Sequence, residues 1–372
     1  MEFLKPVEIG FRRFLLRVLG FFVKRGRSLP DAIDFSSKKY LFVRQDRIGD
    51  VLVSTPLIHA LKDRYPDATV DFLLSSNNHF VLENERLVRK RWIYRKTFAS
   101  ALEILRSVRR ENYDFVIDLM DNPSATSTVL CAFAGGKWNV GLSKENEFSY
   151  DLVVPLISRK DYHIVDRLAM LLTVFGIDPK GIEVKVHYNV KPESEQFAAR
   201  FLADCGVEKG RFIGVNISPG KGTRFWGIEN YRSFIRWLIA EHRENPPVIL
   251  YQPADKAVAQ KIVEPFSDVR ISPETTTFDQ FAALVKSLRI LVTPDTSAVH
   301  LAAAFEIPSV VLYVQSNKDL RIWEPYGSIS ETVVTGVDDL RTITLDEVVR
   351  AMNNLFSSLC SSSPRHPAAP AV

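Results

Sequence analysis

The sequence predicts an α/β protein made of two domains, each built from parallel βαβ units. Short apolar runs alternate along most of the chain with longer segments whose apolar residues recur at helical spacing, the pattern of strands joined by crossover helices. Two junctions, at residues 40–65 and 290–305, place polar side chains in a loop between a strand and a helix, where α/β sheets bind ligands. Because 372 residues exceed one average domain, we expect one junction in each of two domains that face a cleft.

In the first half, the apolar run Tyr40–Val43 predicts a buried strand, and a helix is expected from Leu57. Pro56 has two alternative roles: it can follow an N-cap at Thr55, or lie inside a longer helix that begins near Asp50 and bends. The same patterns predict the other elements of this half: strands at 68–74 and 113–119, and helices at 57–65, 101–108, 162–175 and 192–202, the last connecting the halves.

The second half repeats the alternation of strand and helix, although we find no sequence repeat between the halves. Its expected strands are 212–217, 248–251, 290–292 and 309–313, and its expected helices are 228–241, 256–263, 278–287, 298–305 and 345–359. The chain then divides into a basic leader and linker at 1–37, an N-terminal domain at 38–190, a C-terminal domain closed by the last helix at 191–356, and a tail at 357–372. We expect the tail to be disordered, since it is rich in Ser, Pro and Ala.

Composition is that of an ordinary globular protein, with 46% hydrophobic and 25% charged residues. The net charge of +4 gives no indication of nucleic-acid binding, and it arises locally, because residues 1–27 hold seven Lys or Arg against two Glu. The three cysteines lie far apart, and the histidines show no metal-ligand spacing. We therefore expect no disulfide framework, no metal and no cofactor, in keeping with a reducing cytosol.

The leader contains one amphipathic segment, residues 11–25. As a helix it has Arg13, Arg17, Gly20 and Lys24 on one side. The other side is apolar and consists of Phe11, Phe14, Leu15, Val18, Leu19, Phe21 and Phe22. Arg17 leaves the apolar run too short to span a bilayer, and no signal-peptide cleavage site follows. Two placements remain open: in the interface of an anionic membrane, or against the protein's own surface.

Residues 218–226 form a glycine-containing loop after a predicted strand and are expected to bind an anion. Glycines let main-chain N–H groups approach a ligand, and Lys221 and Arg224 add positive charge, so a diphosphate suits the loop. The loop lacks the Gly-Lys-Ser/Thr spacing of a Walker A motif. The alternative is a solvated basic loop without a ligand.

Asp295 ends a predicted strand just before a helix, where it is expected to be the N-cap. The amides of Thr296 and Ser297 could then hold a phosphate with help from the helix dipole. Capping alone is the simpler interpretation. His300 follows one turn after Thr296 on the same helix face, and a single histidine in such a position is more often a core residue than a ligand.

Two carboxylates in the first junction compete for the role of a general base. Asp50 lies at a helix start, where the helix dipole stabilises a carboxylate whatever its function. Asp46 lies in the same loop, and spacing alone does not decide between them.

These segments resemble glycosyltransferase family 9, the ADP-heptose:lipopolysaccharide heptosyltransferases. Four segments carry the resemblance, in the order expected for the family: residues 44–56 with their Gly-Asp pair, residues 219–226 of the donor loop, residues 294–304 with Asp-Thr-Ser and His-Leu-Ala-Ala-Ala, and residues 315–327 with Pro-Tyr-Gly. The resemblance covers about residues 39–355. Three positions depart from the family pattern: Asp46 and Arg47 stand where the best-known members have Ser-Ser, and Ser297 stands where Gly is usual.

The resemblance implies a GT-B fold, with two Rossmann-like, doubly wound parallel-sheet domains facing a central cleft. The acceptor would bind the N-terminal domain and the nucleotide sugar the C-terminal one, and transfer would invert the anomeric carbon without a metal. Asp50 matches the family's candidate base, with Asp46 and Arg47 as further acceptor-side candidates. The donor-binding candidates are Lys221, Arg224, Asp295, Thr296, Ser297 and His300.

We therefore predict a metal-independent inverting glycosyltransferase that moves a sugar, heptose from ADP-heptose in the first place, onto a lipopolysaccharide core or related envelope glycan. Its predicted partners are a nucleotide-sugar donor, a lipid-linked oligosaccharide acceptor and an anionic membrane surface, with no nucleic acid. Its predicted location is cytoplasmic and peripheral, on the inner face of the inner membrane. The rival interpretations are a GT-B transferase for another nucleotide sugar, a noncatalytic nucleotide- or anion-binding envelope subunit, and a nucleotide-sugar epimerase.

Overall fold

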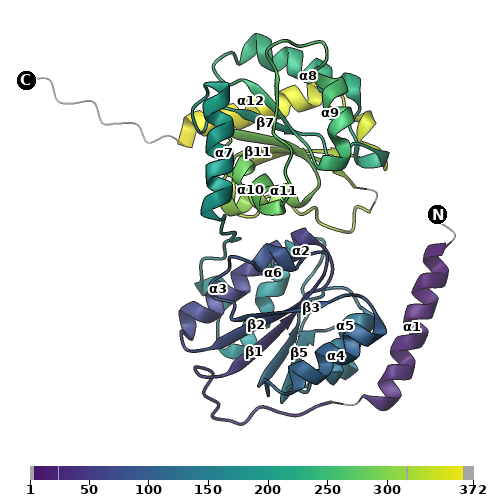
Figure 1. The fold of residues 1–372 in the computed structure, drawn as a ribbon. Coiled ribbons are helices and arrows are strands. Elements are labelled where there is room, and N and C mark those ends of the chain that lie inside the picture. Colours follow the sequence, from purple (N-terminus) through teal and green to yellow (C-terminus); the bar gives the residue numbers. More distant parts are fainter. Residues whose placement is uncertain (1–3, 24, 316, 363–372) are drawn as a thin grey trace, which may run out of the picture. The chain divides into compact units, whose positions relative to one another are not determined.

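The structure, a computed structural model, describes residues 4–23, 25–315 and 317–362 (Figure 1). The chain divides into two compact units. Unit 1 runs to Asn189 and takes in residues 319–321, and unit 2 begins at Val190 and contains the rest. Each unit contains one six-stranded sheet.

In unit 1 the central strand is β1, whose residues 40–43 are at most 1% exposed. The strands are β1 (Lys39–Val43), β2 (Thr69–Ser75), β3 (Lys90–Tyr94), β4 (Phe115–Asp118), β5 (Trp138–Leu142) and β6 (Leu152–Val154). The helices are α1 (Leu4–Phe22), α2 (Ile48–Leu52), α3 (Thr55–Arg64), α4 (Phe98–Arg109), α5 (Ala125–Phe133) and α6 (Ile164–Ala169), which a 3₁₀ turn extends to Phe175. A continuous apolar strand of this kind is typical of a parallel sheet that is covered on both faces.

In unit 2 the sheet consists of β7 (Ile213–Asn216), β8 (Pro247–Leu250), β9 (Arg270–Ile271), β10 (Ile290–Pro294), β11 (Ser309–Val314) and β12 (Ser330–Thr335). The helices are α7 (Pro192–Cys205), α8 (Ile228–Glu241), α9 (Lys256–Val263), α10 (Phe278–Lys286), α11 (Ser297–Phe305) and α12 (Leu345–Ser362). Trp226, which is fully buried, donates a hydrogen bond to the carbonyl of Ile343 at 2.8 Å and so fixes the end of the loop after β7 to the core.

The two sheets have the same strand order. Across unit 1 it is β3-β2-β1-β4-β5-β6, and across unit 2 it is β9-β8-β7-β10-β11-β12, with every neighbouring pair parallel. In each sheet the first three strands are added in one direction and the later strands in the other, and the change of direction lies between β1 and β4 in unit 1 and between β7 and β10 in unit 2. Ligands of open α/β sheets bind beyond the carboxyl ends of the strands at this switch point. The predicted class of two parallel-sheet α/β domains is confirmed.

The segment around Pro56 differs from both predicted alternatives. Ser54 is the N-cap of α3, Thr55 is its first residue and Pro56 its second, so the chain forms two short helices rather than one bent one. The hydroxyl of Ser54 donates to the carbonyl of Asp50 and that of Thr55 to the carbonyl of Leu52, both at 2.7 Å. Hydroxyls that bond back to helix carbonyls in this way compete with the helical pattern and end α2.

The predicted disordered tail is wrong for its first part. α12 continues to Ser362, so residues 357–362 are helical, while residues 363–372 lie outside the described residues. The strands β3, β5, β6, β9 and β12 were also not predicted. β3 shows why, because it is an edge strand whose residues alternate irregularly between exposed and half-buried positions.

The leader forms α1, which packs on unit 1 beside α5. Docking on the protein's own surface was one of the two predicted placements, and the structure shows it. Within the described ranges, no helix combines the length and apolar character that a membrane span needs.

Candidate active site

Arg44, the first residue after β1, organises the switch point of unit 1. Its side chain is only 1% exposed, and one guanidinium nitrogen donates to Asp50 Oδ1 at 2.8 Å. Another nitrogen donates to the carbonyl of Leu119, which follows β4. Arg44 Nε lies 3.1 Å from Asp46 Oδ1. One buried cation thus joins the ends of two neighbouring strands and both candidate bases.

Asp50 is held through both of its carboxylate oxygens. Oδ1 accepts from Arg44, and Oδ2 accepts from the main-chain N–H of Arg47 at 3.1 Å, the reciprocal half of a helix cap. The residue is 8% exposed. Because an ionised carboxylate has about four lone-pair sites, a substrate hydroxyl can still bind to Asp50 while these two bonds fix its direction.

Asp46 has a different environment although it shares the same arginine. Its side chain is 23% exposed. Among the described residues, neither Asp46 Oδ1 nor Arg44 Nε has a hydrogen-bond partner. The 3.1 Å contact between these two atoms is therefore an ion pair without a hydrogen bond. Burial, reinforced by the charge of Asp50, outweighs the attraction of Arg44 and raises the pKa of Asp46 to about 6. Arg47 is exposed beside this pair.

Further acidic residues at this switch point were not predicted. Asp121 Oδ2 accepts from Arg167 at 2.7 Å, and Asp118, fully buried at the end of β4, lies 3.2 Å from Lys144. The Lys144 ammonium, with hydrogen bonds from Ser127 and Tyr150, keeps the pKa of Asp118 low in spite of its burial. The predicted strand at 113–119 includes Asp118 as its last residue but one, so a carboxylate near the carboxyl end of a predicted strand was a usable signal.

In unit 2, a buried aspartate that was not predicted holds the glycine loop. Asp255 Oδ2 accepts hydrogen bonds from Ser218 Oγ at 2.8 Å, from the N–H of Gly220 at 2.9 Å and from Gln252 Nε2 at 2.8 Å. A Cβ atom at Gly220 would lie 2.9 Å from the other Asp255 oxygen, so only glycine fits without displacement. The signal was a polar residue in the loop between a strand and a helix, since Asp255 ends the short 3₁₀ turn that links β8 to α9.

The loop brings Arg224 to the end of β10. Arg224 donates to the carbonyl of Asp295 at 3.1 Å, and its guanidinium lies 3.5 Å from Asp295 Oδ2. The side chain of Arg224 is 45% exposed, and Lys221 in the same loop is exposed as well. Arg224 therefore lies beside the start of α11 with much of its side chain in solvent, and Lys221 is a second exposed cation of the same loop.

The predicted N-cap at Asp295 is wrong, because Thr296 caps α11. The Thr296 side chain accepts from the N–H of Ala298 at 3.3 Å, whereas the Asp295 carboxylate pairs with Arg224. Asn216, at the end of β7, positions this cap by donating to Thr293 Oγ1 at 2.9 Å and to Thr296 Oγ1 at 3.5 Å. Among the described residues, no acceptor pairs with the main-chain N–H groups of Thr296 and Ser297.

His300 lies inside α11 and is 4% exposed, with its ring centroid 6.2 Å from that of Trp323. It is a buried histidine one turn after the cap. In the part of the chain that the structure describes, no three His, Cys, Asp or Glu side chains gather as metal ligands would.

Comparison with known proteins agrees with this geometry. The family model of glycosyltransferase family 9 (heptosyltransferase) matches residues 101–340. The chain belongs to this family. It is accordingly a glycosyltransferase, and the predicted resemblance is confirmed.

Similar proteins fall in the same family. Lipopolysaccharide heptosyltransferase 3 of Escherichia coli is 22% identical over 293 residues, which cover 75% of this chain and 84% of the relative, and its counterpart from strain K12 is 26% identical over 296 residues, covering 75% and 82%. The crystal structure of a family 9 glycosyltransferase from Veillonella parvula has a TM-score of 0.75 at 19% identity and covers 88% of this chain and 100% of its own. E. coli heptosyltransferase WaaC with ADP-2-deoxy-2-fluoro heptose has a TM-score of 0.69 at 18% identity, covering 85% and 99%. These structures share the fold of this family 9 member.

Proposed function

We propose that this family 9 glycosyltransferase transfers heptose from ADP-heptose, with inversion, to a hydroxyl of a lipopolysaccharide core. The names of its relatives support the sugar and the acceptor, since they are lipopolysaccharide heptosyltransferases, and one neighbour in fold was crystallised with an ADP-heptose analogue. The chain spans more than four-fifths of those relatives' length.

The donor end of unit 2 carries the proposal. Lys221 and Arg224 are exposed cations, and the N–H groups of Thr296 and Ser297 lack acceptors among the described residues. These two cations and two N–H groups suit a phosphate or diphosphate, because N–H groups at a helix start and cationic side chains both bind phosphate oxygens. A nucleoside diphosphate is the ligand that these groups fit best.

In the reaction, the acceptor oxygen forms a bond to C1 of the sugar while the bond between C1 and the diphosphate oxygen breaks. Asp50 takes the proton of the attacking hydroxyl, and the electron pair of the broken bond leaves with the diphosphate. Lys221, Arg224 and the two amides stabilise the charge on that leaving group, which is commonly the largest contribution to such catalysis. A general base typically adds a factor of about 10²–10⁴.

Arg44 gives Asp50 its orientation in this scheme. Its hydrogen bond to Oδ1 and the Arg47 amide on Oδ2 fix the plane of the carboxylate, so the remaining lone pairs point in a set direction. Fixed geometry of this kind lowers the entropy lost on reaching the transition state.

We further infer that the acceptor is lipid-linked and that the enzyme works at the cytoplasmic face of the inner membrane as a peripheral protein. The support is the lipopolysaccharide named for its relatives, whose core is built on a lipid, and the basic, apolar leader.

The test is turnover by the purified full chain with a delipidated core oligosaccharide and a panel of nucleotide sugars, ADP-heptose first. We expect transfer from ADP-heptose, with an inverted anomeric configuration by NMR. Transfer from another nucleotide sugar instead would establish a different donor, and retained configuration would overturn inversion. Donor binding without any turnover would point to a noncatalytic envelope subunit.

A further inference from the structure

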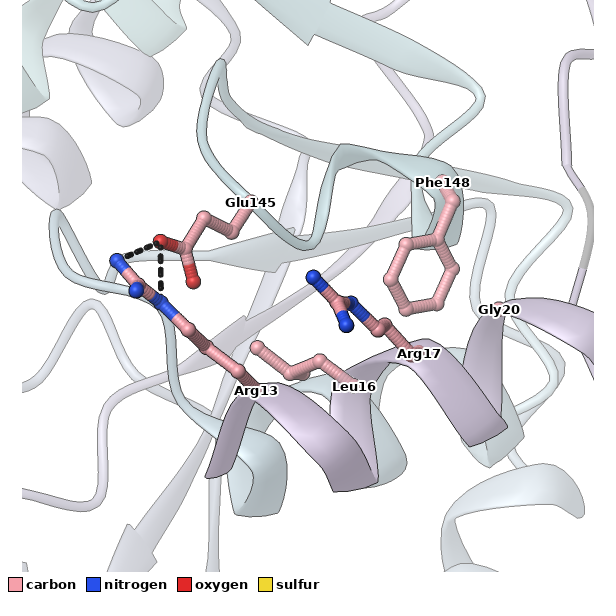
Figure 2. A pocket seen from close by; sticks show the side chains of 6 residues that line it. All are labelled: Arg13, Leu16, Arg17, Gly20, Glu145 and Phe148. Atoms are coloured by element: carbon pink, nitrogen blue, oxygen red, sulfur yellow. Dashed lines mark hydrogen bonds and ion pairs between the residues drawn. The ribbon is translucent and has the colours of Figure 1, made fainter. Parts of the chain in front are cut away.

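Helix α1 docks on unit 1 through one face. Arg13 donates two hydrogen bonds to Glu145 at 3.2 and 3.3 Å, and Leu16 is only 3% exposed (Figure 2). A Cβ atom at Gly20 would meet the ring of Phe148 at 3.7 Å, an ordinary contact, so the helix backbone passes close to that ring.

The segment after α1 is fixed even more firmly. Arg25 donates to Asp151 at 2.9 Å and to the carbonyls of Gly136 and Ala132 at 3.2 Å. The N–H groups of Gly26 and Arg27 donate to the same carboxylate at 3.1 and 3.0 Å. The Asp151 side chain is buried, and the N–H of Asn139 also donates to it, at 2.9 Å. The bond from Asn139, followed by those from the leader, keeps the pKa of Asp151 low despite this burial. The helix is therefore carried by unit 1 rather than tethered loosely to it.

The opposite face of α1 is apolar and lies in water. Phe14 is 61% exposed, Val18 37%, Phe21 82% and Phe22 81%. At 100° per residue these four side chains fall within an arc of about 100°. Single exposed apolar residues are ordinary, but a contiguous group of three phenylalanines and a valine on one helix marks a contact surface.

Charge indicates the kind of surface that covers this face. The first 27 residues hold seven Lys or Arg against two Glu. Arg17 borders the apolar arc, has no ion-pair partner among the described residues, and lines a hollow of about 450 Å³ together with Leu16 and Phe148 (Figure 2). An apolar face bordered by an unpaired cation, on a segment with an excess of basic residues, matches the interface of an anionic bilayer, where acyl chains lie below a layer of phosphates.

We propose that Phe14, Val18, Phe21 and Phe22 insert into an anionic lipid surface while the opposite face of α1 remains bound to unit 1. The docked helix then holds unit 1 at the bilayer in one fixed orientation, which a flexible tail could not do. This names the membrane-contacting residues of the proposed peripheral enzyme, and it does not depend on which sugar is transferred.

The test uses the full chain and vesicles of phosphatidylethanolamine with phosphatidylglycerol, or of phosphatidylcholine alone, in a co-sedimentation assay. The variant Phe21→Ser/Phe22→Ser changes two exposed side chains, so the fold is expected to persist. We expect it to lower binding to anionic vesicles at least about tenfold, since each phenylalanine contributes apolar area and few charges remain to compensate. Binding of the unaltered chain should fall in phosphatidylcholine and at high salt.

The matched control is Phe98→Ser, because Phe98 is 86% exposed at the start of α4 and is not part of the leader. It should bind vesicles like the unaltered chain. Equal sedimentation of the double variant and the unaltered chain would overturn the proposal. The proposal would also be overturned if analytical ultracentrifugation showed a dimer for the unaltered chain and a monomer for the double variant, while both bound vesicles equally. The exposed face would then join two copies of the chain.

Turnover on a delipidated acceptor separates this inference from the proposed function. The double variant should keep full activity there, because neither residue lies near the switch points. If the double variant loses vesicle binding but keeps its turnover, the result supports the membrane-binding face. If the unaltered chain binds vesicles but shows no turnover, the membrane-binding face is retained and the proposed transferase activity is rejected. Deleting residues 1–27 is a poorer test, because it also uncovers Glu145, Phe148 and Asp151.

Discussion

The two switch points share a topology but have opposite chemistry. In unit 1 the ends of the first and fourth strands carry the buried carboxylates Asp50 and Asp118 and the partly exposed Asp46, balanced by Arg44 and Lys144 inside the protein. In unit 2 the loop after the first strand carries two exposed cations, Lys221 and Arg224, and Arg224 pairs with Asp295 at the end of the fourth strand. The shared sheet order favours a ligand site at the same place in each unit, while the side chains after the strands give the two places different charge, which suits the proposed base in unit 1 and the proposed diphosphate site in unit 2.

The difference in burial between the two units fits the proposed roles. A general base works best when its carboxylate is held in place and its pKa is close to neutral pH, and burial raises the pKa of one carboxyl in this part of unit 1, that of Asp46, to about 6. A phosphate site must instead leave its donors available, as the 45% exposure of Arg224 does.

The largest expected effect concerns the base. Asp50→Asn keeps the shape of the side chain but removes the proton acceptor, so kcat should fall at least about a hundredfold with donor affinity nearly unchanged. Single-turnover kinetics and calorimetry with ADP measure the two quantities, and circular dichroism checks the fold, since Arg44 loses a charged partner.

Asp46→Asn is the matched comparison for that experiment. Asp46 has an oxygen without a hydrogen bond among the described residues and a raised pKa, so it is the carboxylate best placed to contradict the assignment. A hundredfold loss in Asp46→Asn with near-normal Asp50→Asn would transfer the role of base to Asp46.

The second effect concerns the anion site of unit 2. Arg224→Ala removes charge-assisted hydrogen bonds worth about 1.5–3 kcal/mol, so the Kd for ADP should rise roughly 10- to 150-fold and that for adenosine much less. Arg243→Ala, an exposed arginine elsewhere in unit 2, is the control and should change neither. Equal losses for ADP and adenosine in the Arg224 variant would show that Arg224 does not contact phosphate.

The third prediction separates the loop from its charges. In Gly220→Ala the new methyl group meets the Asp255 carboxylate at 2.9 Å, so the loop must shift. Overpacking of this kind costs about 1–3 kcal/mol of unfolding free energy, and ADP affinity should fall with it. Gly336→Ala, where nothing lies within 4 Å of the added atom, should alter neither the melting temperature nor ADP binding. An unchanged melting temperature in Gly220→Ala would mean that Asp255 does not hold the loop.

The fourth prediction uses the pH dependence of unit 1. Because burial raises the pKa of Asp46 from 3.8 to about 6, the folded protein keeps a proton between about pH 4 and 6 that the unfolded chain has lost. The Asp46 carboxyl therefore makes the unfolding free energy fall as pH rises through that window, by roughly 1–2 kcal/mol. The Asp46→Asn variant lacks this ionisation, so its melting temperature minus that of the unaltered chain should increase from pH 4 to pH 6. A difference that stays constant over this range would contradict the raised pKa of Asp46.

The smallest expected effect is that of a chelator. If Lys221, Arg224 and the α11 amides supply the positive charge at the diphosphate, EDTA should leave turnover intact. Activity that EDTA abolishes and Mg²⁺ restores would instead require a metal at the donor.

Local sequence pattern predicted much of the fold. Continuous apolar runs gave β1, β4, β7 and β11, and helical spacing gave α8 with its observed bounds, because these signals depend only on neighbouring residues. The segments that resemble family 9 lie at the carboxyl ends of strands for the same reason, since strand, loop and helix follow one another in the chain. Edge strands such as β3 were missed because partial exposure removes the apolar run.

Only the tertiary structure decided which distant residues meet. The common strand order of the two sheets has no counterpart in a sequence repeat, because order is set by pairing between segments far apart in the chain. Asp255 holds Gly220 across 35 residues, and Arg44 reaches the carbonyl of Leu119 across 75. The choice of Thr296 over Asp295 as the cap followed from Arg224, which draws the aspartate away. Likewise the sequence determined that the leader has an apolar and a basic side, whereas Glu145 and Phe148 decided which side faces the protein and left the phenylalanines in water.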